Sequence, residues 1–521
     1  MIKVKISNTW FIASLYCISL LSCGQQKKEI AQIEKVQTAE AVEILKKPNI
    51  IWLMAEDIST DIECYGMQAV KTPNLNRMAE NGVRFENAFV TNPICSPSRS
   101  SMMLGVHQVK SNTHHHRSNR ETPLDPQFTP FTQLLREAGY TTILGNHSVM
   151  NKGRKIDVNF KYENLGEWDG KTKFGLFDKY DTFEKQDEPF FAQIQLVATH
   201  RGDWWDEVRA KSKHPVNPND VVLPEFMADH PTIRLDWAKY LDQMEYIDAE
   251  IGVIFKELED KGMADNTMVI FIGDNGRCNI KGKGYLHDPG LRIPLIVYYP
   301  EQLKKGEIRK DVVSATDITA TILDAAGVEI PDFMTGKPMF DPDFKRDYVY
   351  AARDLWDEVE EKSRAVTSGE WKYIRNDMPK VPFDAHQAYL EFYRPAVHVM
   401  RTLKKQGKLT KTQEFFFKDT KPKEELYDLK NDPLETKNLV ADPKYAEIVK
   451  ELREKTLTLD KEMEPVSTTY VPIASKAVAI LEYVKKEKPA LYQEMQNGVE
   501  IGFKKMADDY KKHLKESQKQ Q

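Results

Sequence analysis

Residues 48–57 read PNIIWLMAED, a largely apolar run rich in β-branched and aromatic side chains that ends in Glu56 and Asp57. This pattern predicts a short strand buried on both faces, as in parallel sheets covered by helices. Residues 268–275 read MVIFIGDN and repeat the pattern, with an aspartate and an asparagine after the apolar run. Open α/β sheets bind ligands at the carboxyl ends of their strands, so both polar pairs are candidate site residues.

Helix and strand patterns alternate along the chain around these two runs. Helices are predicted at residues 131–138, before Gly139, and at 237–258, and further strands at 141–144, 190–197 and 295–299. This alternation predicts an α/β domain over residues 48–345, with a mostly parallel central sheet flanked by helices on both faces. Short strand patterns at 348–351, 371–374 and 426–429 then lie among charged helical stretches. Residues 346–521 are therefore predicted to form a smaller C-terminal α+β subdomain.

The charges of the chain are nearly balanced. Its 521 residues include 79 acidic and 74 basic side chains, which gives a formal net charge of -5. This balance argues against a general attraction for nucleic acid or for anionic membranes. Any anionic substrate must be held by local groups.

The N-terminus has the features of an export signal. Lys3 and Lys5 precede an apolar run at residues 10–21 that is too short to span a bilayer, so residues 1–22 are predicted to be a signal peptide. The run ends in LLSC, which resembles the lipobox of bacterial lipoproteins and implies that Cys23 is acylated. A plain secretory signal with an incidental cysteine is the alternative. Residues 23–47 are polar and are predicted to be a flexible tether.

This resemblance implies an exported lipoprotein, located in the periplasm or at the outer membrane or cell surface of a bacterium. The lipid would be its only attachment to a membrane. Of the five cysteines, Cys17 and Cys23 belong to the predicted signal, which leaves Cys64, Cys95 and Cys278. An odd number of cysteines in an exported protein indicates a free or a modified thiol.

The residues from Cys95 to Gly105 read CSPSRSSMMLG. This sequence resembles the C-x-P-x-R signature of the formylglycine-dependent sulfatases and the S-x-x-x-x-G element that follows it. The resemblance implies an alkaline-phosphatase-like fold and a maturase that oxidises Cys95 to formylglycine. In that family one hydroxyl of the hydrated aldehyde attacks sulfur, and the other lets the product collapse and expel sulfate. A structural cysteine in a proline-containing turn is the alternative interpretation.

The resemblance also implies a bound Ca²⁺, which prefers hard oxygen ligands. Its candidate ligands are Glu56, Asp57, Asp274, Asn275 and the modified Cys95. Glu56 stands where the family usually has an aspartate, and its longer side chain changes the geometry. Taken singly, each carboxylate is also consistent with a helix cap or a surface charge.

An ester sulfate gains charge in the transition state, so cations are expected around it. The resemblance implies that Arg99 holds the formylglycine and the sulfate. His200 follows the predicted strand at 190–197, and Lys283 lies in GKGYL, as do the family's substrate-binding histidine and lysine. Either His200 or Lys283 is a candidate to protonate the leaving alcohol.

One family element has two competing alignments here. The pair Lys155 and Asp157 preserves the usual spacing of a lysine and its partner, whereas His147 preserves a histidine without the lysine. Asp157 would then orient a sugar hydroxyl or a lysine. In the run HHHR at residues 114–117, the candidate substrate-groove residues are His115, His116 and Arg117; a solvated loop or an adventitious metal patch is the alternative.

Residues 364–374 and 425–439 resemble C-terminal elements of the same family, so the resemblance spans about residues 48–445. It implies hydrolysis of sulfate esters on a polysaccharide or oligosaccharide, of the algal ulvan type or a glycosaminoglycan. Two other functions remain open at this point. One is a phosphatase or phosphonate hydrolase of the same superfamily, and the other is an inactive glycan-binding lipoprotein.

Overall fold

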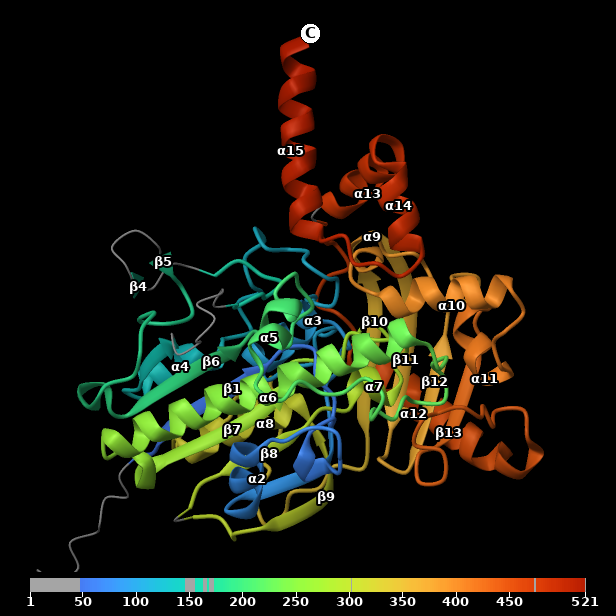
Figure 1. Cartoon of the computed structure of the whole chain (residues 1–521). Coiled ribbons are helices and arrows are strands. Elements are labelled where there is room, and N and C mark those ends of the chain that lie inside the picture. The colour runs from blue at the N-terminus through green and yellow to red at the C-terminus, as the bar shows by residue number, and fades with distance from the viewer. Residues whose placement is uncertain are drawn as a thin grey trace, which may run out of the picture. The chain divides into compact units, whose positions relative to one another are not determined.

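In the computed structural model, strand β1 (Asn49–Ala55) lies inside a seven-stranded sheet of order β3-β6-β1-β7-β8-β2-β9 (Figure 1). The other strands are β2 (Val83–Phe89), β3 (Thr141–Leu144), β6 (Phe190–Leu196), β7 (Thr267–Gly273), β8 (Leu295–Tyr298) and β9 (Glu307–Ser314). The structure describes residues 47–145, 155–162, 166–167, 173–300, 302–472 and 475–520. The predicted signal peptide, Cys23, residues 23–46 of the predicted tether, and His147 lie outside these ranges.

The large sheet is mostly parallel, as predicted. β1 runs parallel to both β6 and β7, and β3 runs parallel to β6. β8, the strand predicted at residues 295–299, runs antiparallel to its neighbours β7 and β2. The α/β prediction with a mostly parallel central sheet is thus confirmed, and β8 is its one reversed strand among the described residues.

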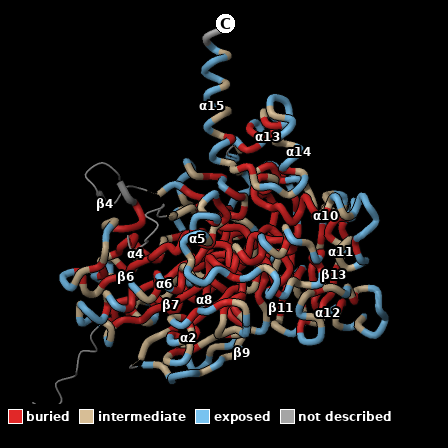
Figure 2. The backbone as a smooth tube through the Cα atoms, in the orientation of Figure 1, coloured by how far each residue is buried: buried red, intermediate tan, exposed pale blue. Residues whose placement is uncertain are grey.

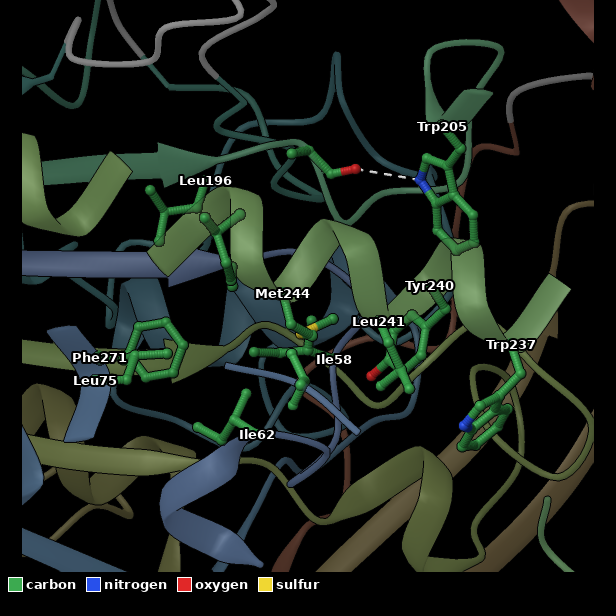
Figure 3. Packing of buried hydrophobic residues seen from close by; sticks show 14 of the residues in the cluster. Ile58, Ile62, Leu75, Leu196, Trp205, Trp237, Tyr240, Leu241, Met244 and Phe271 are labelled. Carbon is green, nitrogen blue, oxygen red and sulfur yellow. Dashed lines mark hydrogen bonds between the residues drawn. The ribbon is translucent and has the colours of Figure 1, made fainter. Parts of the chain in front are cut away.

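Both faces of the sheet are covered by helices, which explains the uninterrupted apolar pattern of β1. Ile51, Leu53 and Ala55 face the core beside α2 (Pro73–Glu80) and α6 (Pro231–Asp260). The alternate residues face a second core beside α3 (Cys95–Leu104), α4 (Phe131–Glu137) and α8 (Ala315–Ala325). Figure 3 shows part of the first core, where side chains of β6, β7 and α6 pack together, among them Leu196, Phe271, Tyr240, Leu241 and Met244. All seven residues of β1 are buried, as period-two alternation between two apolar layers requires.

The helices of this part of the chain are α2, α6, α3 (Cys95–Leu104), α4 (Phe131–Glu137), α5 (Trp205–Lys211), α7 (Asp288–Leu291) and α8 (Ala315–Ala325). The helix predicted at residues 237–258 begins earlier, at Pro231. His230 caps it by accepting a hydrogen bond from the Thr232 amide at 3.2 Å, and proline is favoured at a first helical position. Within the described residues, no helix is both long enough and apolar enough to cross a bilayer.

The C-terminal part contains a second sheet, entirely antiparallel, of order β10-β11-β12-β13. Its strands are β10 (Val349–Trp356), β11 (Val359–Thr367), β12 (Trp371–Asn376) and β13 (Glu424–Asp428). Its helices are α9 (Ala388–Glu391), α10 (Pro395–Lys405), α11 (Lys411–Glu414), α12 (Ala446–Glu462), α13 (Lys476–Glu487), α14 (Pro489–Gln496) and α15 (Phe503–Gln520). A two-stranded ribbon, β4 (Gly166–Glu167) with β5 (Lys173–Phe174), completes the strands described.

Residues 47–521 form one compact unit, so a domain boundary near residue 345 stays a prediction. In Figure 2 the backbone through the central strands is buried, and exposed residues gather on the outer helices and loops. The carboxyl ends of β1, β6 and β7 lie side by side, because Ala55 pairs with Leu196 on one side and with Gly273 on the other. The segments that follow these three strands carry six of the predicted site residues: Glu56, Asp57, His200, Asp274, Asn275 and Lys283.

Candidate active site

Cys95 is the first residue of α3 and is buried, with 2% of its surface exposed. The Lys283 ammonium donates a hydrogen bond to its Sγ at 2.9 Å and another to Asp57 Oδ1 at 2.6 Å. The thiol in turn faces Asp57 Oδ1 at 3.6 Å. Because the N-terminus of a helix favours negative charge, position 95 suits a group that becomes anionic or that contacts an anion.

Asp57 and Asp274 meet because their strands are neighbours. The Asp57 amide donates to Asp274 Oδ1 at 3.0 Å, and Asn275 Nδ2 donates to Asp57 Oδ1 at 3.0 Å. Asp57 adopts a left-handed backbone with φ 53°, a conformation that costs a non-glycine residue energy and often marks a functional site. The two predicted polar pairs at strand ends therefore form one cluster.

Arg99 lies one turn along α3 from Cys95 and is 3% exposed. Its Nε donates to Asp274 Oδ2 at 2.9 Å, and its Nη1 donates to Gln195 Oε1 at 2.8 Å. Gln195 in turn donates to the Met54 carbonyl at 2.8 Å. Gln195 was not predicted from the sequence. A glutamine inside the apolar run at residues 190–197 is nevertheless a signal, because a buried polar side chain needs a hydrogen-bond partner.

Glu56 is 2% exposed and lies next to two basic side chains. Lys155 Nζ donates to Glu56 Oε2 at 2.7 Å, and His200 Nε2 lies 3.8 Å from the same oxygen. His200 Nδ1 donates to the Arg201 carbonyl at 2.9 Å, which leaves Nε2 facing the cluster. Lys155 also lies 3.4 Å from Asp157 Oδ2.

The donor set fits a hard cation. One ligand atom each of Glu56, Cys95 and Asp274 lies within 4.8 Å of the others. Asp57 Oδ2 and Asn275 Oδ1 are buried and have no hydrogen-bond partner among the described residues. Carboxylate and amide oxygens with free lone pairs are the ligands that Ca²⁺ prefers, and such atoms are rarely left unpaired in a folded protein. The residues present are therefore suited to bind a metal ion.

Burial and neighbouring charges shift the pKa values of Cys95, Asp57 and His200. Burial raises the pKa of the Cys95 thiol far above its ordinary value, and Asp274 adds to the effect, so the thiol is protonated. Burial also opposes ionisation of Asp57, but Lys283 and His200 lower its pKa strongly overall. Burial lowers the pKa of His200 to about 4 despite Glu56 and Asp57, so its ring is neutral at pH 7.

The predicted groove residues lie in different environments. His116 is buried and its Nδ1 contacts Asp357 Oδ1 at 2.8 Å, whereas the Arg117 side chain is 45% exposed. The His115 ring contacts those of His114 and Tyr470 in tilted arrangements, with centroid distances of 4.1 and 3.9 Å. Asp157 is nearly buried and is paired with Arg120 as well as Lys155. Of the groove residues, Arg117 is thus the most available to a ligand.

Comparison with known families identifies this arrangement. The family model described as "Sulfatase" matches residues 48–328, the part of the chain that holds every residue of the cluster. The chain belongs to the sulfatase family. A second model, described as "N-sulphoglucosamine sulphohydrolase, C-terminal", matches residues 374–462 of this sulfatase. The protein is accordingly a sulfuric ester hydrolase, as its sequence predicted.

Individual relatives agree with this family. The sulfatase is 27% identical to an "Ulvan-active sulfatase" of Formosa agariphila, over 85% of this chain and 79% of the relative. It is also 27% identical to the human N-sulphoglucosamine sulphohydrolase, over 78% of this chain and 88% of that enzyme. A solved structure in complex with D-glucosamine-2-N,6-O-disulfate has the same fold, with a TM-score of 0.54 at 18% identity, covering 80% of this chain and 98% of that one.

Proposed function

We propose that this sulfatase removes sulfate from a carbohydrate, through a formylglycine made from Cys95 and with a bound Ca²⁺. The observation that carries the proposal is the convergence of Lys283 and Asp57 on the Cys95 sulfur at the N-terminus of α3. The names of the relatives support the substrate class, since one is called ulvan-active and another acts on N-sulphoglucosamine. An ulvan-type polysaccharide or a glycosaminoglycan fragment is the expected substrate.

A formylglycine at position 95 would supply a hydrated aldehyde as the nucleophile, which an unmodified thiol does not provide. The chain's own residues hold that position. Lys283 contacts Sγ, and Asp57 accepts hydrogen bonds from both Lys283 and Asn275. A protonated, buried thiol has little reactivity of its own, which supports its role as the precursor of the modified residue.

Calcium would be held by Glu56, Asp57, Asp274, Asn275 and the modified residue 95. When bound, it would supply positive charge at the reacting group. The chain's own residues add to this charge: Lys283 is bonded to Asp57, and Lys155 is bonded to Glu56. Such fixed cations lower the energy of an ester sulfate as charge develops on it. Lys283 is the candidate proton donor to the leaving alcohol that this geometry favours, because the neutral His200 ring uses its Nδ1 proton to bond the Arg201 carbonyl.

The export and lipid anchoring predicted from the N-terminus are part of this proposal. Acylation of Cys23 would place the enzyme in the periplasm or at the outer surface of a bacterium, where sulfated polysaccharides are encountered. Detergent phase separation tests it: the full-length chain should enter the detergent phase when made in a Gram-negative host. The Cys23→Ala variant should stay in the aqueous phase. Equal partition of the two would contradict the lipid anchor.

The decisive experiment for the mechanism is mass analysis of the peptide containing residue 95, after co-expression with a formylglycine-generating maturase. Conversion of the thiol to the aldehyde removes about 18 Da. The converted enzyme should release sulfate from ulvan oligosaccharides or N-sulphoglucosamine, and Cys95→Ala should not. Faster hydrolysis of phosphate or phosphonate esters than of sulfate esters would instead favour the alternative hydrolase. An unmodified thiol with full activity would contradict the aldehyde mechanism.

A further inference from the structure

Tyr389 packs near the start of the nucleophile's helix, although it comes from the C-terminal half of the chain. It is the second residue of α9. Its ring packs against the buried cluster of Ile94, Cys278, Trp356 and Leu390. Ile94 directly precedes Cys95 and caps α3. The ring of Tyr389 therefore contacts a cluster that includes the residue just before the nucleophile.

The ring of Tyr389 is fixed in place from a second side. Its centroid lies 5.0 Å from that of Tyr393 and 5.2 Å from that of Phe503, the first residue of α15. Offset and edge-to-face aromatic contacts of this kind are individually weak but restrict a ring well when several act together. In Figure 1, α9 lies close to α13, consistent with the aromatic cluster that joins them.

The helix itself is tied to the predicted substrate groove. Gln387, which caps α9, donates to Asp357. Asp357 also contacts the ring of His116 at 2.8 Å, and His116 precedes Arg117. The turn between β10 and β11 thus links α9 to the loop that carries Arg117, and it fixes Tyr389 relative to the groove.

The hydroxyl of Tyr389 is not used by the protein. Among the described residues it has no hydrogen-bond partner, in contrast to Tyr393, whose hydroxyl donates to Asp203 at 3.1 Å. Tyr389 is only partly buried, and its oxygen is not among the sealed polar atoms of the interior. An open phenol hydroxyl on an immobilised ring is a group that a ligand can bind at little entropic cost.

Charged groups of the site and of the groove both act on this hydroxyl. Burial raises the pKa of the Tyr389 phenol; Lys283 and Arg117 act against the rise, and Cys278 and Asp57 add to it. Lys283 contacts the Cys95 sulfur, and Arg117 is 45% exposed at the groove. Tyr389 packs against the cluster that contains Ile94, next to the nucleophile, and its helix is linked through Gln387 and Asp357 to the loop of Arg117. This placement brings it near both the nucleophile and the groove, where the sugar that carries the sulfate would be held.

We propose that Tyr389 is a substrate-binding residue of the sulfatase, whose neutral hydroxyl hydrogen-bonds to the sugar ring that bears the scissile sulfate. This inference rests on the proposed function, because it assigns Tyr389 to the carbohydrate and not to the sulfate group. It extends the site beyond the motif residues, all of which precede residue 284. It also gives the C-terminal half of the chain a direct part in substrate choice.

The test compares Tyr389→Phe with the unaltered, formylglycine-containing enzyme on two kinds of substrate. On ulvan oligosaccharides or N-sulphoglucosamine, loss of one neutral hydrogen bond should lower kcat/KM by about 3- to 10-fold. On 4-nitrophenyl sulfate, which has no sugar, kcat/KM should stay within about twofold. Tyr510→Phe removes a hydroxyl from the same aromatic cluster and should alter neither value.

Three other results would overturn the assignment. If Tyr389→Phe kept the kcat/KM of the unaltered enzyme on both substrate kinds, the hydroxyl would not contact the substrate. A similar loss on both would show that it acts on the sulfate or on the fold. If the unaltered enzyme hydrolysed 4-nitrophenyl sulfate but no carbohydrate, the proposed carbohydrate function would fail, and this inference with it.

Discussion

At the scale of single residues, Asp57 holds the site together through one oxygen and leaves the other open. Its Oδ1 accepts from Lys283 and Asn275, while its Oδ2 is buried without a partner among the described residues. A buried oxygen of this kind is costly unless a ligand binds it. The arrangement therefore predicts that Asp57 Oδ2 is a metal ligand.

Addition of calcium to metal-stripped enzyme should raise its unfolding midpoint by several degrees, since a ligand at 100 times its Kd stabilises by about 2.7 kcal/mol. The rise should be absent from Asp57→Asn, which loses the charge that attracts the cation. Thermal unfolding followed by tryptophan fluorescence, with and without calcium, measures both. Asp265→Asn, a change at an exposed position, should keep the full rise. An undiminished rise in Asp57→Asn would exclude Asp57 from the metal site.

The sequence predicted much of this cluster because its members follow recognisable patterns. Glu56, Asp57 and Asp274 come directly after apolar runs, and the register of β1 with β7 brings them together. Gln195 and Tyr389 were not predicted. Neither belongs to a motif, and Tyr389 reaches the site only through packing between α9 and residues almost 300 positions earlier. Such long-range packing leaves no local signal in a sequence.

At the scale of elements, the loop that carries Lys283 is shaped by a tryptophan of the second sheet. Gly284 has φ 91°, and a Cβ placed there would lie 1.8 Å from the Trp356 ring. The adjacent Lys283 carbonyl accepts from Arg394 at 2.9 Å. A side chain at position 284 would have to displace either the ring or the loop, because both the backbone conformation and the space require glycine.

Gly284→Ala should therefore lower kcat/KM by about 10-fold or more, since small misplacements of a catalytic group cost heavily. Sulfate release from 4-nitrophenyl sulfate measures this change. Gly327→Ala is the matched control, because Gly327 also has a positive φ, of 68°, but no atom lies within 4 Å of the position that a Cβ would take there. The control should lose stability slightly and keep its kcat/KM. Equal activity of the two variants would mean that Lys283 tolerates movement of its loop.

The segment after α3 packs against β10 through His107, a buried histidine whose protonation at low pH should destabilise the fold. His107 is 3% exposed, and its ring lies 4.9 Å from that of Tyr350. Burial, with help from Arg364, lowers the pKa of His107 to about 3. As the pH falls, the unfolded chain therefore takes up a proton on His107 before the folded chain does. The contribution of the neutral histidine to stability is complete above about pH 6.5 and is lost as the pH falls toward 3.

His107→Asn should lose less stability than the unaltered enzyme between pH 7 and pH 5. The difference is at most about 2 kcal/mol, given by 1.5 pH units of linkage. Urea unfolding at the two pH values measures it. His214→Asn, at an exposed histidine, should behave like the unaltered enzyme. An unchanged pH dependence in His107→Asn would show that another group governs acid sensitivity.

The prediction of strands succeeded where the apolar periodicity and the length of the run were clear. It failed where the neighbouring strands and connections determine the structure. The runs that became β1, β6 and β7 were predicted within a residue or two. The antiparallel direction of β8 was not, because direction depends on its connection and not on its composition. β2 and β9 were missed, since they carry charged residues at exposed or half-buried positions that interrupt the apolar pattern.

At the scale of the whole molecule, a buried network of charges joins the two sheets. Lys372 of β12 has 0% exposure and is bonded to Asp288 of α7, which precedes β8. Lys372 also lies 3.3 Å from Glu435, and Glu435 accepts from the Asp288 amide at 2.8 Å. Lys281 donates to the Glu435 carbonyl at 2.7 Å. The segment around Lys283 is thus held between the large sheet and the C-terminal sheet.

Such a network couples the unfolding of the two sheets. If either sheet unfolded alone, buried charged groups on the other would lose their partners. Lys372→Met removes the buried cation shared by Asp288 and Glu435 and leaves Asp288 only the longer contact with Arg292, at 3.8 Å. Breaking a buried pair in this way costs about 3–5 kcal/mol. Scanning calorimetry of the chain from residue 48 should show one transition, shifted as a whole to lower temperature. Lys362→Met, an exposed change on β11, should leave it in place. Two transitions, with only one displaced by Lys372→Met, would instead establish the predicted boundary near residue 345 as a true domain boundary, with a C-terminal half that unfolds independently.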